Sequence, residues 1–499
     1  MHASENSSAG QDTMAPRNDT TASRFSMLRR WPISSPTAAW YAGRRRDLLS
    51  TGPPSGHNAA YVNDRSPWVR AFDRIGGPVY RDHMARTPLG PTTSGSVTVR
   101  RRPKDRKAQI ARASAEAFSA LGYHGVSMEA IASRVGISAA ALYRHYSSKY
   151  ELFRDAVLNL GQQLVDCTTF ADTEDGADPP EQLRRLAGAL TDTSLANRES
   201  GGLYRWEARY LNDDDQAALN AQMRTVHHRI QRPLRTMRPE LTSRERWMLS
   251  TAALSVIGSV VDHRAKLPAG QIRDVLGEIV DSVLAAELPE LPETTAVTAP
   301  APSAVSATKY EALLTESMRL FNQNGYRDTT MEDIAAAVGM PASGIYRYFS
   351  GKADILAAGF RRAADRLSAD MAEILNAGGE PEEILAALID DYVVRSFERP
   401  ELEHVYYTER LNMTPADQKI LRDLQRSAVE SWVNVVMPVR PQWSAGQARF
   451  AVHAAMALVI DLGRLMEYQN CEPARAVVAT MIDLVLLGRY RLRTALPAR

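Results

Sequence analysis

The stretch at residues 325–352 reads GYRDTTMEDIAAAVGMPASGIYRYFSGK, and it predicts two short helices joined by a tight turn. Thr330 is a candidate N-cap, and Asp333 three residues later completes the capping-box pattern of a helix start. The next apolar residues recur at helical spacing and define one buried face: Met331, Ile334, Ala335 and Val338. Gly339 follows, and a glycine there lets the backbone turn left-handed and end the helix.

The second short helix is expected to begin near Pro341, because proline suits the first turn of a helix. Ile345 and Phe349 are spaced to face the first helix. The outer face then carries small and aromatic polar residues: Ala342, Ser343, Tyr346 and Tyr348. This is the pattern of a helix-turn-helix.

The same stretch occurs earlier in the chain, at residues 122–149, as GYHGVSMEAIASRVGISAAALYRHYSSK. Phe118 to Lys149 align with Phe321 to Lys352 without a gap, at an offset of 203 residues. Farther on, at an offset of 202, Tyr204 and Glu207 align with Tyr406 and Glu409. A fixed offset over this length predicts a tandem duplication of one all-helical module.

In the first copy, Ser127 and Ser138 are the expected N-caps, Gly136 makes the turn, and Leu142 and Tyr146 anchor the second helix. Ala130 stands where the second copy has the acid of the capping box, so the first cap is expected to be slightly weaker.

A helix-turn-helix places its second helix in the major groove of DNA. Small residues let that helix approach the base edges, tyrosine hydroxyls reach phosphates, and a lysine at the next helix start anchors a phosphate. The candidate DNA-binding residues of the first copy are Ser127, Ser138, Ala139, Ala140, Tyr143, His145 and Lys149. Those of the second copy are Thr330, Ala342, Ser343, Tyr346, Tyr348 and Lys352.

These motifs resemble the TetR family of bacterial transcriptional regulators over about 50 residues in each copy. Both copies keep the same spacing between the features that carry the resemblance: the glycine–tyrosine pair, the N-cap, the turn glycine, the tyrosine of the second helix and the lysine that follows it. The resemblance implies an all-α fold in which each module is a three-helix DNA-binding domain followed by a helical effector and dimerisation domain. It also implies a regulator, usually a repressor that a small ligand releases from DNA. The duplication departs from the family, whose typical member has one module and dimerises.

The two copies differ in charge. Residues 100–149 hold ten basic and three acidic side chains, whereas residues 303–352 hold five of each. Because phosphate contacts dominate non-specific affinity, the first module is expected to bind DNA more strongly. Arg100, Arg101 and Arg102 belong to an arm that either enters the minor groove or is a solvated basic stretch.

The middle helices carry aromatic and charged residues that either line an effector pocket or pack as core: Tyr204, Trp206, Glu207, Tyr406, Tyr407 and Glu409. The later helices are apolar on most faces and are therefore expected to be buried. In the TetR family they form a four-helix dimer interface, which the second copy can supply within one chain. An intramolecular pseudo-dimer on an imperfect palindromic operator is the leading architecture, and a homodimer with four reading heads is the competitor.

The 499 residues divide by composition and periodicity. Residues 1–97 are expected to be disordered or to precede the true start. The predicted domains are DNA-binding at 98–160 and 306–364, and helical effector and dimerisation at 161–287 and 365–499. A proline-rich linker joins them at 288–305.

Other functional classes find little support in the sequence. With two cysteines, no disulfide framework or multi-cysteine metal site is expected, and a reducing cytoplasm fits. We find no phosphate loop, H-E-x-x-H or G-x-S-x-G motif, and His227 and His228 point apart on a helix, so neither catalysis, cofactor nor metal is predicted. No apolar stretch is long enough to span a membrane. The sequence therefore predicts a sequence-specific DNA-binding regulator whose DNA binding is relieved by a small-molecule effector. The alternative is that only the first module binds DNA, and that the second is degenerate and serves as a dimerisation partner within the chain.

Overall fold

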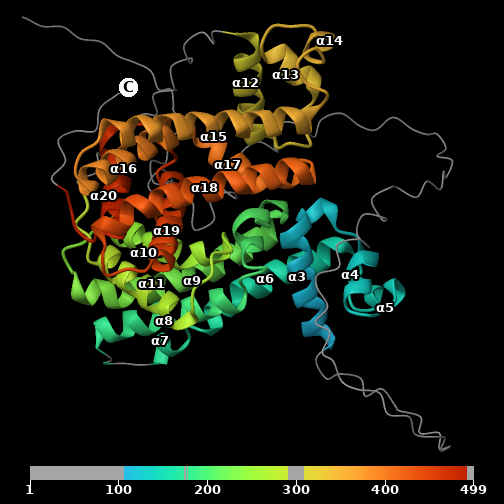
Figure 1. The fold of residues 1–499 in the computed structure, drawn as a ribbon. Helices are drawn as coiled ribbons and strands as arrows, with labels where there is room; N and C mark the ends of the chain where they lie inside the picture. Colours follow the sequence, from blue (N-terminus) through green and yellow to red (C-terminus); the bar gives the residue numbers. More distant parts are fainter. Residues whose placement is uncertain (1–105, 174–175, 177, 290–307, 492–499) are drawn as a thin grey trace, which may run out of the picture.

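The computed structural model describes residues 106–173, 176, 178–289 and 308–491, and within these ranges every regular element is a helix and no strand occurs (Figure 1). The all-α prediction is confirmed. Segment 1–97, nearly all of the predicted linker, and Arg100, Arg101 and Arg102 lie outside the described residues.

The first half, blue to green in Figure 1, begins with a short helical bundle and continues into a longer one. It contains α3 (Arg106–Gly125), α4 (Met128–Arg134), α5 (Ala139–Tyr143), α6 (Lys149–Asp166), α7 (Phe170–Thr173), α8 (Pro179–Ala196), α9 (Asp213–Met237), α10 (Ser243–Gly258) and α11 (Ala269–Leu284). A π-helical turn η2 (Leu203–Glu207) and a 3-10 turn η3 (Ala208–Tyr210) lie between α8 and α9, and η4 (Ser259–Val261) follows α10.

The second half repeats this order, yellow to red in Figure 1. It contains α12 (Lys309–Asn324), α13 (Met331–Ala337), α14 (Ala342–Ile345), α15 (Lys352–Ala377), α16 (Pro381–Glu398), α17 (Pro400–Glu409), η5 (Arg410–Asn412), α18 (Pro415–Val439), α19 (Ala445–Leu465) and α20 (Glu472–Leu486). Segments α17 and η5 occupy the place of η2 and η3. The predicted domain boundaries at 160 and 364 fall inside α6 and α15, so one helix continues from each helix-turn-helix segment into the helical bundle behind it.

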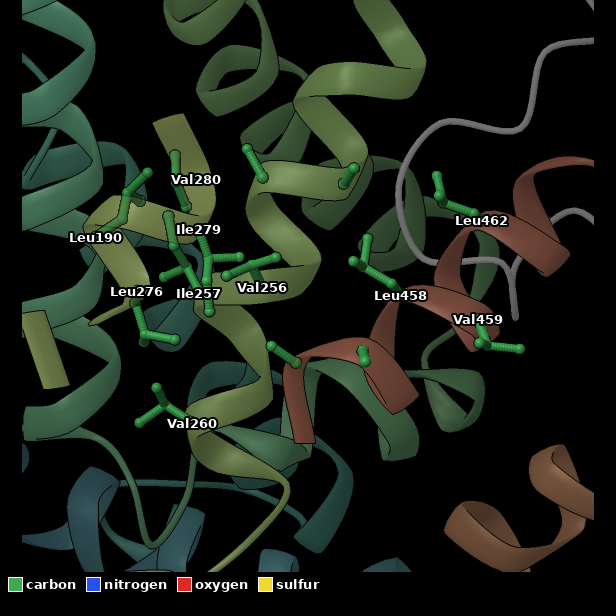
Figure 2. Packing of buried hydrophobic residues seen from close by; sticks show 14 of the residues in the cluster. Leu190, Val256, Ile257, Val260, Leu276, Ile279, Val280, Leu458, Val459 and Leu462 are labelled. Atoms are coloured by element: carbon green, nitrogen blue, oxygen red, sulfur yellow. The ribbon is translucent and has the colours of Figure 1, made fainter. Parts of the chain in front are cut away.

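The two halves share a hydrophobic core formed by α10 and α11 with α19 and α20. Figure 2 shows Val256 of α10 on the side of Leu458 and Leu462 of α19, whereas Ile257 lies beside Ile279 of α11. All five side chains are buried, and burying an aliphatic side chain of this size contributes about 1.5–3 kcal/mol. The predicted burial of the last helices is therefore confirmed, and the partner of each pair is the other half of the same chain.

The two helix-turn-helix segments pack into different hydrophobic clusters. Phe118, Ile131 and Leu142 of the first belong to the shared core. Phe321 and Ile345 of the second belong to a separate buried cluster, to which α17 and α18 also contribute. Among the helices in the described ranges, none has the length and apolarity needed to cross a bilayer.

Candidate nucleic-acid interface

The second helix-turn-helix starts with the predicted capping box. The Asp333 N–H donates to Thr330 Oγ1 at 3.1 Å, and the Thr330 N–H donates to Asp333 Oδ2 at 2.9 Å. Gly339 has a φ of 65°, as the turn requires. Pro341 precedes the first turn of α14 rather than lying within it, because its ψ of 146° is extended and Ala342 is the first helical residue. That detail of the prediction was wrong by one position.

The first helix-turn-helix uses single caps. Ser127 Oγ accepts the Ala130 N–H at 3.1 Å, and Ser138 Oγ accepts the Ala141 N–H at 3.2 Å. Gly136 turns the chain with a φ of 66°. The expected capping roles are confirmed, and the hydroxyls of Ser127, Ser138 and Thr330 are engaged locally. Their contacts with DNA stay a prediction.

The outer face of each second helix is open to solvent. Tyr143 is 49% exposed, Tyr346 55% and Tyr348 41%, while Leu142 and Ile345 beneath them are fully buried. The smaller candidates also lie at this surface: Ala140, His145 and Ser343 are exposed, and Ala139 and Ala342 are half-buried. Helices α5 and α14 lie at separate outer positions of the molecule (Figure 1). Among the described residues, both faces are therefore solvent-exposed.

Lys149 and Lys352 begin the next helices, as predicted, but their ammonium groups fold back onto the protein. Lys352 Nζ donates to the carbonyl oxygens of Tyr326 and Thr329 at 2.6 and 2.7 Å, and it lies 4.7 Å from the centre of the Tyr326 ring. Lys149 Nζ donates to the Tyr123 carbonyl at 3.1 Å. Burial lowers the pKa of both ammonium groups. Lys352 therefore ties the start of α15 to the connection between α12 and α13, and Lys149 ties the start of α6 to the end of α3. The predicted phosphate contact of each lysine stays a prediction.

A buried glutamate connects each DNA-binding domain to the helical body. Glu207 Oε2 accepts the Tyr123 N–H at 3.0 Å, and Glu409 Oε1 accepts the Tyr326 N–H at 3.4 Å. Each of these tyrosines follows a glycine of positive φ at the end of the first helix. Burial raises the pKa of the Glu207 carboxyl, and nearby Arg209 opposes that shift. The two glutamates hold equivalent positions in the two modules.

Contacts across the two modules meet at the same place. Arg209 Nη1 of the first module donates to Glu409 Oε1 of the second at 2.5 Å, and Arg209 Nη2 donates to the Thr408 carbonyl at 2.7 Å. The Trp206 and Tyr407 rings stack with centroids 4.1 Å apart. The sequence places Arg209 among the charged residues of the middle helices but does not predict its pairing with Glu409. The signal available was the glutamate that both copies retain at one register.

The predicted pocket residues divide between core and cavity walls. Trp206, Glu207 and Glu409 are buried. Tyr204 borders a cavity of about 110 Å³ that is lined mainly by the first module and closed by the C-terminal end of α19. Tyr406 and Tyr407 border one of about 410 Å³ in the second module. A third cavity, of about 740 Å³, lies between the modules and is lined by Trp206, Glu207, Tyr406 and Tyr407.

The family model described as "Bacterial regulatory proteins, tetR family" matches this chain twice, at residues 110–156 and 313–358. These matches span α3 to α6 and α12 to α15, the helices that form each DNA-binding domain. They support the assignment of both segments to this family of bacterial DNA-binding regulators.

Among characterised proteins, the "HTH-type transcriptional activator FasR" of Mycolicibacterium smegmatis is 46% identical over 54 residues. That match spans 11% of this chain and a quarter of the relative's length.

Two solved structures are also similar. The TetR family regulator PfmR from Thermus thermophilus is 24% identical and has a TM-score of 0.31; the match covers 35% of this chain and 96% of PfmR. A TetR-family regulator from Bordetella parapertussis is 18% identical with a TM-score of 0.33, and the match covers 36% of this chain and 95% of that regulator.

Proposed function

We propose that this protein is a sequence-specific transcriptional regulator whose two helix-turn-helix units act together, within one chain, on an imperfect palindromic operator. The observation that carries the proposal is the pair of exposed recognition helices, α5 and α14, each in a segment that matches the tetR family. The packing of α10 and α11 on α19 and α20 supports the pseudo-dimer, because it fills within one chain the interface that a second subunit would otherwise supply.

The proposed regulation uses the module cavities as effector sites. In the first module, the buried hydroxyl oxygens of Thr251 and Ser255 border the cavity and have no hydrogen-bond partner among the described residues. In the second, Tyr392 donates to Glu403 at 2.7 Å on the cavity wall. A mostly apolar wall with a few polar groups is typical of a small-molecule site.

The glutamate contacts supply a route from these cavities to DNA. Trp206 of η2 borders the first-module cavity, and Glu207 beside it binds the Tyr123 N–H. Tyr407 of α17 borders the second-module cavity, and Glu409 on the same helix binds the Tyr326 N–H. A ligand that moves η2 or α17 would thus reorient a DNA-binding domain, and differential binding to two states is what coupling requires. We propose that the effector relieves repression in this way.

The test is selection of bound fragments from genomic DNA with the full chain, followed by footprinting and sedimentation of the complex. The pseudo-dimer predicts two protected half-sites about one DNA turn apart, bound by a single chain. Two chains on four half-sites would support the homodimer instead, and no preference over random competitor DNA would refute the proposal. A reporter gene placed behind the selected operator then decides the sign of regulation; because the FasR relative is named an activator, this measurement is needed.

A second candidate function follows from the charge difference between the copies. The second DNA-binding domain has Glu332 and Asp333 in the first turn of α13, whereas the first has only Glu129 in α4. If the second module serves only as a built-in partner, the footprint covers one half-site, and Tyr346→Ala leaves the DNA affinity unchanged while Tyr143→Ala lowers it.

A further inference from the structure

The cavity between the modules is a composite site that neither module forms alone. Its walls come from α3, η2 and residues 261–266 of the first half and from α17, η5, α18 and α19 of the second. Its volume of about 740 Å³ lies in the range of small-molecule sites. A ligand bound there would touch both modules at once.

Cationic side chains dominate the wall of this junction cavity. Six line it, two from the first half and four from the second: Arg264, Lys266, Arg410, Arg422, Arg426 and Arg449. The three acids are Glu207, Asp262 and Glu430, and each is already engaged by protein donors. Glu207 accepts the Tyr123 N–H, Asp262 Oδ1 accepts the Trp206 indole N–H at 2.7 Å, and Glu430 pairs with Arg449. The six cations and three carboxylates of the wall give it a formal charge of +3. Three of the cations are also held in ion pairs: Arg449 with Glu430, Arg264 with Glu199 and Arg426 with Asp423.

His263 adds a hydrogen-bond donor that the protein leaves unused. Its Nδ1 accepts the Ala265 N–H at 3.2 Å and lies 3.3 Å from the Arg198 guanidinium, which can only donate. Nδ1 is thus an acceptor, and the neutral ring carries its proton on Nε2. That buried Nε2 has no hydrogen-bond partner among the described residues. His263 lines the cavity and stacks on His453, which also lines it, with ring centroids 3.8 Å apart.

We propose that the junction cavity binds a small molecule carrying a phosphate group. Arginine and lysine donors match phosphate oxygens, and an oxygen at the His263 end supplies the acceptor that the Nε2–H lacks. The stacked Trp206 and Tyr407 rings give the same cavity an apolar wall for the rest of the ligand. Glu207 lines the cavity and also accepts the Tyr123 N–H, so a bound ligand would affect the first DNA-binding domain. Only this effect on DNA binding rests on the proposed function.

The test is calorimetric titration of the full chain with inorganic pyrophosphate, without DNA, at an ionic strength held constant with sodium chloride. We expect saturable binding of one pyrophosphate per chain. Lys266→Gln with Arg422→Gln removes one exposed cavity cation from each half and is expected to weaken binding by about tenfold or more. The matched control, Arg235→Gln with Lys419→Gln, removes two exposed cations of α9 and α18 that lie outside the cavity wall, and is expected to change affinity by less than about twofold.

Three results would overturn the inference: no saturable heat at about millimolar pyrophosphate, equal weakening in the cavity and control variants, or two equivalent sites per chain. Circular dichroism of the variants verifies that they are folded, which is expected because all four side chains are exposed. Since DNA is absent, a negative titration leaves the proposed DNA binding untouched, and failure of operator selection leaves the titration valid.

Discussion

Glu409 carries a buried charge to which both modules make contacts. It is 3% exposed, and it accepts from Arg209 of the other module at 2.5 Å, from Asn412 at 2.8 Å and from the Tyr326 N–H at 3.4 Å. Glu409→Gln preserves the size of the side chain but removes the carboxylate that pairs with the Arg209 guanidinium, whose side chain is 7% exposed.

The expected cost follows from this burial. Removing one partner of a buried ion pair destabilises a protein by about 3–5 kcal/mol. We expect about 3 kcal/mol, the lower end of that range, because the Thr408 carbonyl still accepts from Arg209. The second DNA-binding domain should also lose affinity for its half-site, since the Tyr326 N–H loses a charged acceptor.

Glu207→Gln is the matched control, because Glu207 holds the equivalent tyrosine N–H and is also buried. Burial raises the pKa of the Glu207 carboxyl, so an amide recovers desolvation while it keeps an acceptor oxygen. The expected cost is about 1 kcal/mol or less. Urea unfolding at pH 7, followed by circular dichroism, measures both variants. Equal losses, or a loss below about 1 kcal/mol for Glu409→Gln, would refute the reasoning.

Three further predictions address the arm, Lys352 and acid stability. Neutralising Arg100–Arg102 should reduce the salt slope, the slope of log affinity for DNA against log salt concentration, by about two to three. Neutralising Lys309 and Arg327 should reduce it less, and equal slopes for the two variants would contradict the charge asymmetry. Lys352→Met should cost about 2 kcal/mol of stability, because three backbone carbonyls lose a charged donor, and should leave the salt slope unchanged; a slope reduced by about one with stability unchanged would assign Lys352 to a phosphate instead. Burial lowers the pKa of His227 to about 3, so below about pH 6.5 this side chain is protonated in the unfolded chain and neutral in the folded one. This difference alone should lower stability by about 1.4 kcal/mol for each pH unit below 6.5. His227→Gln should flatten the pH dependence of the urea midpoint, the same change at the exposed neighbouring histidine should not, and parallel curves for wild type and His227→Gln would exclude this contribution.

The local features of the helix-turn-helix units could be predicted from the sequence because short-range geometry decides them. A capping box needs only Thr330 and Asp333 at the right spacing, and a turn that ends a helix left-handed needs Gly136 or Gly339. Helical periodicity alone separates buried Ile345 from exposed Tyr346. These predictions were confirmed, apart from the one-residue displacement of the second helix at Pro341.

The parts that the sequence could not predict depend on contacts distant along the chain. Arg209 and Glu409 are 200 residues apart, and only the packed structure brings them together. The ammonium of Lys352 lies at a helix start, where a phosphate contact is a reasonable expectation, but the carbonyls that accept from it belong to a loop placed by tertiary packing. The junction cavity likewise has no local signal, since its cations come from both halves.

The junction also shows what a covalent duplication permits and a symmetric dimer does not. Arg209 and Leu411 occupy equivalent positions, yet Arg209 pairs with Glu409 of the other module, whereas a Leu411 methyl lies 3.5 Å from where a Cβ on Gly122 would stand. In a homodimer the same residue would make both contacts, and the buried pair would occur twice. Because both modules are encoded in one chain, a residue of one module can be substituted without the same substitution in the other. The second DNA-binding domain is therefore tied to the body of its partner module by a buried charge and the first by an apolar contact, so the two reading heads need not respond equally to one ligand.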